Sequence, residues 1–166
     1  LLKEHDVTTP YILLEDGCNP LFYQPIKSKI GPKKEEWSVV YAGMIFPMKL
    51  DSSKYGASQF VPLGELFAQE RIHFHLYPSP HHNYQYPEYE AEAMRNPYFH
   101  LHSAVDFGKV HQEISQYDFG WMAVNSPRTS NILYSDVYYQ HAISAKVYTY
   151  LEAGLPVIFN SHLKRV

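Results

Sequence analysis

Lys146 is the residue whose type and position indicate chemistry most directly. Ser144 can cap a helix whose apolar positions follow at Val147, Tyr150 and Leu151, which places Lys146 in the first helical turn. The unpaired backbone N–H groups of that turn attract anions, and a lysine beside them makes the site suited to phosphate. The competing interpretation is a surface lysine that points away from the helix end.

A second anion-binding position is indicated upstream. Gly43 closes the β-branched run at residues 38–43, and Lys49 follows six residues later. A glycine at the carboxyl end of a strand lets the backbone approach a ligand closely. Only one glycine is present, so the pattern is neither a P-loop nor a dinucleotide fingerprint. An ordinary turn at the end of a strand is the simpler interpretation.

Two histidine pairs raise the question of a metal. His73 and His75 alternate on one predicted strand, and His100 and His102 alternate on another, so each pair shares a face and could chelate zinc. No Asp, Glu or Cys lies nearby at ligand spacing, and helices are expected to cover those faces of the sheet. We therefore predict ordinary histidines with satisfied hydrogen bonds and no metal site.

The elements that must position these residues alternate along the chain. Strand-length apolar runs occur at residues 11–14, 38–43, 72–77, 98–101, 119–124 and 155–159. Helical spacing occurs at residues 58–70, 88–94 and 110–117, and in a last helix that Gly154 and Pro156 end. Repeated strand–helix–strand units predict a Rossmann-like three-layer α/β/α domain with a mostly parallel sheet. Ligands bind beyond the carboxyl ends of such strands.

Composition limits the classes of function. A length of 166 residues predicts one domain with a hydrophobic core. A net charge of -3 with 14 Lys plus Arg disfavours nucleic acid as a partner. No apolar run approaches the roughly 18 residues that span a bilayer, and the charged first residues do not resemble a signal peptide. Cys18 is the single cysteine, which fits a reducing compartment, so we expect a cytoplasmic protein.

Residues 144–158 carry a resemblance to a known family. Their sequence, SAKVYTYLEAGLPVI, is similar to the stretch P-x-K-x-x-E-Y-x-x-x-G-x-P-V-I in the C-terminal domain of group 1 GT-B glycosyltransferases. Residues 40–43 followed by Lys49 resemble that family's G-R-x-x-x-x-K loop, and residues 117–120 resemble the step into its fourth strand. Residues 13–22 look like the segment that joins its two domains.

The resemblance implies a site for a nucleotide-diphosphate sugar donor, with no metal or other cofactor required. Lys146, Lys49 and the helix start would hold the diphosphate, and the main chain of residues 103–105 would meet the base. No catalytic residue is assigned, because acceptor binding and any general base belong to the family's N-terminal domain. The implied donor-binding residues are Gly43, Lys49, Ser103, Ala104, Val105, Ser144, Lys146 and Tyr150.

The resemblance also implies a domain layout. Residues 1–36 correspond to the interdomain segment and connection, and residues 37–166 to a nucleotide-sugar-binding domain that is truncated at its C-terminus. We expect this chain alone to be inactive, with the acceptor bound through an absent N-terminal domain. Retaining chemistry and peripheral membrane association are common in the family.

The chain departs from the family pattern at several positions. His141 and Thr149 stand where the two glutamates of the family's E-x7-E motif fall, Met44 replaces the loop arginine, and Ser144 replaces the usual proline. These departures put contacts to the donor sugar in doubt. A non-catalytic Rossmann-like module for binding or assembly is therefore the alternative, and a zinc hydrolase that uses the histidine pairs is a third.

Overall fold

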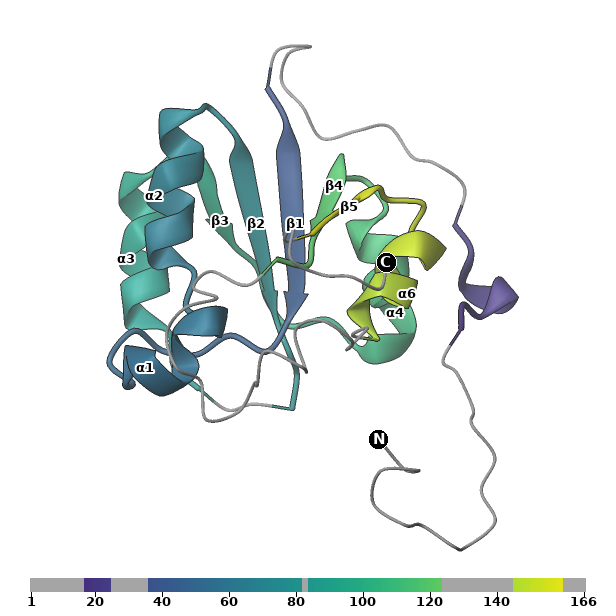
Figure 1. The fold of residues 1–166 in the computed structure, drawn as a ribbon, viewed down its shortest axis with the longest axis horizontal. Coiled ribbons are helices and arrows are strands. Elements are labelled where there is room, and N and C mark those ends of the chain that lie inside the picture. The colour runs from purple at the N-terminus through teal and green to yellow at the C-terminus, as the bar shows by residue number, and fades with distance from the viewer. Residues whose placement is uncertain (1–16, 25–35, 82–83, 124–144, 160–166) are drawn as a thin grey trace, which may run out of the picture.

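One sheet of five parallel strands organises the chain, in the order β3-β2-β1-β4-β5 (Figure 1). The computed structural model describes residues 17–24, 36–81, 84–123 and 145–159. The strands are β1 (Ser38–Gly43), β2 (His73–Pro78), β3 (Phe99–Leu101), β4 (Phe119–Trp121) and β5 (Val157–Ile158). The predicted parallel α/β fold is confirmed, and the predicted strand at residues 11–14 lies outside the described residues.

Helices cover both faces of this sheet, which completes a Rossmann-like α/β/α arrangement. The helices are α1 (Ser52–Tyr55), α2 (Val61–Gln69), α3 (Pro87–Arg95), α4 (Phe107–Ile114) and α6 (Lys146–Glu152), with 3-10 turns η2 (Pro20–Phe22) and η3 (Gly56–Ser58). Figure 1 shows α2 and α3 on one side of the sheet and α4 and α6 on the other. Among the described residues, no helix has the length and apolar character needed to cross a bilayer.

The strands bury apolar side chains on both faces. Val39, Phe74 and Phe99 belong to one core cluster, and they pack with residues of α2 and α3. Val40 and Tyr77 belong to a second cluster, which includes residues of α4 and α6. Adjacent residues of a strand point to opposite faces, so β1 carries apolar residues on both faces, whereas β2 and β3 alternate apolar residues with histidines.

The strand order reverses direction beside β1. From β1 the chain moves outward through β2 and β3, and it then returns to the other side of β1 to form β4 and β5. In open α/β sheets a crevice forms where the order reverses, beyond the carboxyl ends of the two central strands. In this chain the crevice lies beyond Gly43 and Trp121, the last residues of β1 and β4.

Residues 17–24 hold the last helix, α6, in place. The Glu152 carboxylate accepts a hydrogen bond from the Asn19 N–H at 2.6 Å, and the Glu152 carbonyl accepts one from the Gln24 N–H at 3.1 Å. Phe22 stacks on the His111 ring of α4 at a centroid distance of 4.6 Å. This segment therefore fixes α6 against α4.

Candidate functional site

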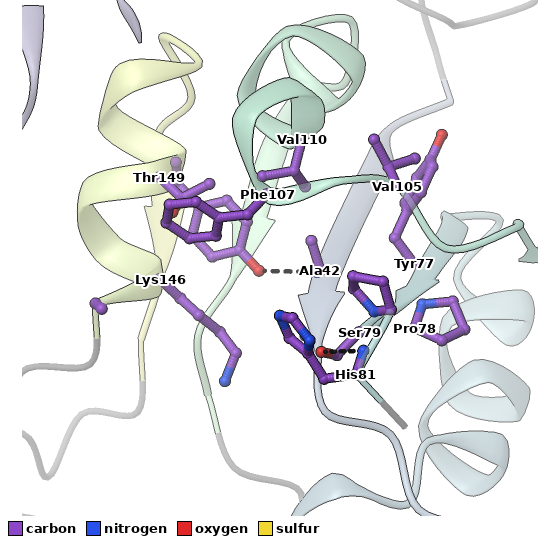
Figure 2. A pocket seen from close by; sticks show the side chains of 14 residues that line it. Ala42, Tyr77, Pro78, Ser79, His81, Val105, Phe107, Val110, Lys146 and Thr149 are labelled. Carbon is purple, nitrogen blue, oxygen red and sulfur yellow. Dashed lines mark hydrogen bonds between the residues drawn. The ribbon is translucent and has the colours of Figure 1, made fainter. Parts of the chain in front are cut away.

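A pocket of about 170 Å³ lies at the point where the strand order reverses (Figure 2). Its walls come from the ends of β1 and β2, the loop after β3, and the first turns of α4 and α6. The pocket therefore lies at the edge of the sheet to which the rule for ligand binding in α/β folds points. Gly43, Val105, Lys146 and Tyr150, four of the predicted donor-binding residues, line the pocket.

Lys146 reaches from α6 across the pocket toward β1. Figure 2 shows its side chain extending from the first turn of the helix toward the carboxyl end of β1. Its Nζ lies 5.2 Å from the centre of the Tyr41 ring. A Cβ built on Gly43 would overlap the Lys146 Cε and lie 3.3 Å from Nζ. The side chain thus lines the pocket.

Gly43 is required at its position for two reasons. Its φ is +152°, a backbone conformation that residues with a side chain rarely adopt. The absence of a Cβ also leaves room for the lysine. The two residues that the sequence singled out separately are therefore in contact, and they lie 103 positions apart in the chain.

Gly43→Ala is expected to lower the free energy of unfolding by about 1–3 kcal/mol, because it forces a strained backbone and displaces Lys146. Urea denaturation followed by circular dichroism measures the change. Gly108→Ala is the matched control, since a Cβ on Gly108 of α4 meets nothing within 4 Å. That control is expected to be neutral, or to stabilise by up to about 1 kcal/mol through helix propensity. Equal losses in the two variants would contradict the assignment.

Tyr150 positions the start of α6 instead of offering its hydroxyl to a ligand. The side chain is fully buried, and its hydroxyl donates to the Trp121 carbonyl at 3.0 Å and accepts from the Ala42 N–H at 3.2 Å. Burial raises the pKa of this phenol well above its usual value. Lys146 lies one helical turn before Tyr150, so these two bonds fix its backbone beside β1 and β4.

Three further predicted residues, all of them described, do not line this pocket. Lys49 is exposed in the turn after β1, and Ser103 and Ala104 are exposed in the loop after β3. Ser144 lies outside the described residues, and Ala145 holds the N-cap position of α6 without a side-chain cap bond.

Several residues that line the pocket were not among the predicted donor-binding residues. They include Pro78, Ser79, Pro80, His81, Phe107 and Thr149. The sequence signal for the first four was the Pro-Ser-Pro stop after the second described strand, which marks the strand's carboxyl end. Among the described residues that line the pocket, none is Asp or Glu. Its described lining thus presents one ammonium group and no carboxylate, which suits an anion.

The two histidine pairs meet on the face of the sheet that α4 and α6 cover. His73 Nδ1 lies 2.9 Å from His100 Nε2, and His75 Nδ1 lies 2.9 Å from His102 Nε2. The His75 and His100 rings stack at 4.3 Å with an angle of 13° between their planes. Parallel register explains the contact, because His75 and His100 are direct partners across β2 and β3.

The expectation of ordinary, satisfied histidines is wrong at His75. Its Nε2 is buried and has no hydrogen-bond partner among the described residues. One carboxylate contacts the cluster from outside the histidine segments, since Glu36 Oε2 lies 3.4 Å from His73 Nε2. Burial, with smaller contributions from the neighbouring imidazoles, lowers the pKa of His75 to about 2 and that of His100 to about 4.

Comparison with known proteins adds no relative. The chain matches no protein-family model and no curated protein sequence. The fold and the pocket geometry therefore carry the functional argument.

Proposed function

We propose that this chain is the donor-binding domain of a cytoplasmic GT-B glycosyltransferase, which transfers a sugar from a nucleotide-diphosphate sugar to an acceptor. The observation that supports this most is the meeting of Lys146 and Gly43 in a pocket at the reversal of strand order. These residues belong to the two segments that resemble the family's phosphate-binding elements. Their approach across the fold is the arrangement that a diphosphate site requires.

The proposed role of Lys146 is electrostatic. Its ammonium group would neutralise the donor diphosphate and stabilise the charge that develops as the sugar leaves, which needs no metal. The glycine at the end of β1 gives the phosphates close access to backbone, and Val105 on the opposite wall would contact the nucleoside. The acceptor and any general base would come from a second domain, and a membrane surface would be a further partner of the full enzyme. Sugar transfer by this chain alone would overturn that division of roles.

A non-catalytic binding or assembly module is the alternative, and the replacement of two family side chains favours it. Thr149 lines the pocket at the position of the family's second glutamate. Met44, in place of the loop arginine, is 40% exposed. A pocket without those two groups has fewer contacts for a donor sugar. A module of this kind would bind neither the nucleotide diphosphates nor their sugars.

Lys146→Ala is expected to weaken binding of a nucleoside diphosphate by roughly tenfold or more, about 1.4 kcal/mol, because it removes the cation from the pocket. Calorimetric titration with UDP, GDP and ADP at low salt measures the affinity and identifies the base. Lys109→Ala is the matched control, since Lys109 is an exposed lysine of α4 that does not line the pocket.

The outcomes separate the two functions. Binding of one diphosphate that Lys146→Ala weakens and Lys109→Ala leaves within about twofold supports a donor site. Equal weakening by both substitutions would indicate a general charge effect and would contradict the assignment of Lys146. Absence of binding to all three nucleotides favours the non-catalytic module.

A further inference from the structure

We propose that His73, His75 and His100 form a binding site for Zn²⁺ or a chemically similar divalent transition metal, at the edge of the sheet formed by β2 and β3. One ring nitrogen from each of these side chains lies within 4.8 Å of the others. The site is separate from the nucleotide pocket, whose lining includes none of the three. It does not depend on the proposed transferase function.

The spacing of the nitrogens is close to what zinc requires. Zn–N bonds of about 2.0–2.1 Å in a tetrahedral site place two ligand nitrogens roughly 3.3 Å apart. His73 Nδ1 and His100 Nε2 are 2.9 Å apart, so an ion can replace the hydrogen that the two nitrogens share. The third nitrogen lies within 4.8 Å of the other two, so a ring rotation is needed to bring it to the ion.

The Glu36 carboxylate is a hydrogen-bond partner of His73. Metal-binding histidines usually have such a partner on the ring nitrogen that does not bind the metal. Its Oε2 lies 3.4 Å from His73 Nε2, and its other oxygen accepts a 2.7 Å bond from Arg71. A carboxylate that accepts from one ring nitrogen leaves the lone pair of the other nitrogen for the metal. In His73 that second nitrogen is Nδ1, which faces His100.

His75 supplies the observation that ordinary packing does not explain. The residue is 5% exposed, its Nδ1 is hydrogen-bonded to His102, and its Nε2 has no partner among the described residues. A buried polar atom without a partner is costly, and a bound ion is one of the few explanations for it. Coordination of a metal would satisfy this nitrogen.

Metal binding at this cluster requires a change in ring orientation and an entry route for the ion. The His75 and His100 rings are stacked with nearly parallel planes, so an ion in the plane of one ring lies outside the plane of the other, and one ring must rotate for both to bind it. His73 and His100 are only partly buried and lie on the outer two strands of this side of the sheet, which gives an entry route. The bound ion would join β2 to β3 and keep a fourth position for water.

Titration of the full, chelator-treated chain with Zn²⁺ tests the proposal. We expect one tight site per chain, with affinity reduced at least tenfold in His73→Gln and in His100→Gln. Glu36→Gln is expected to weaken zinc roughly 10–100-fold, as loss of a ligand's carboxylate partner usually does. His81→Gln, at an exposed histidine outside the cluster, is the matched control and is expected to keep wild-type affinity.

X-ray absorption at the zinc edge is the second measurement. It uses the unmodified chain, so a folding defect in a variant cannot affect the result. Three imidazole nitrogens at about 2.0–2.1 Å are expected. Fewer than two imidazoles around the ion would overturn the site. The site is equally overturned if the chain binds no zinc, or if His73→Gln and His100→Gln fold normally and bind zinc as tightly as His81→Gln does.

Discussion

Tyr150→Ala is expected to lower the free energy of unfolding by about 3–5 kcal/mol, the range for removal of a large buried aromatic side chain. The ring is fully buried against Gly120, where a Cβ would overlap it, and the second core cluster closes around it. The hydroxyl bonds Ala42 of β1 and Trp121 of β4, so the substitution also leaves two backbone groups unpaired. Urea denaturation followed by tryptophan fluorescence measures the loss.

Two control variants separate the contributions at this position. Tyr150→Phe keeps the ring and removes the two bonds, so we expect a smaller loss of about 1–3 kcal/mol. Leu151→Ala, next to Tyr150 in the same helix and 49% exposed, is expected to change stability by about 0.5 kcal/mol or less. A Tyr150→Ala loss no larger than that of Leu151→Ala would show that α6 does not depend on this contact.

The fold was predictable because its determinants are local in sequence. Apolar runs that end at Gly43 and at residues 78–80 define strands from their own residue types. The alternation of strands with helices then implies a parallel sheet, and the structure confirms it. The edge of the sheet that carries the pocket followed from the same reasoning, since it needs only the chain direction of each strand.

The details of the site depend on contacts that sequence patterns do not contain. The partnership of Gly43 with Lys146 requires the place of α6 beside β1, which the strand order decides. Tyr150 resembled a ligand contact in the sequence, yet its hydroxyl bonds two strand ends. These differences reflect packing between distant segments.

The histidine cluster is a second example of contacts that sequence patterns do not contain. Each pair was judged separately, because residue spacing cannot give the register between two strands. The pairing of His75 with His100 across β2 and β3 joins the pairs into one cluster. Glu36, which precedes β1, reaches His73 because β1 and β2 are neighbours.

The metal-free chain is expected to lose stability as pH falls from about 7 to 5, by roughly 3–4 kcal/mol from His75 and His100 together. In the unfolded chain both imidazoles have a pKa near 6.5. In the folded chain burial lowers these values to about 2 and about 4. Below about pH 6.5 the unfolded state binds protons that the folded state does not, so stability falls with pH. Above that pH both states are neutral and the contribution vanishes.

Urea midpoints measured with a chelator between pH 7.5 and pH 5, roughly spanning the histidine range, test this expectation. The carboxylates whose pKa is lowered, Glu36 and Asp51, titrate mainly below this window, so the slope reports the histidines. Burial also lowers the pKa of His102, which adds to the slope of His75 and His100 with the same sign. His100→Phe keeps a ring for the stack and removes one titrating group, so its slope should be shallower than that of the unmodified chain. A stability that stays flat from pH 7 to 5 would mean that the cluster accepts protons in the folded state, through an opening of the β2–β3 edge.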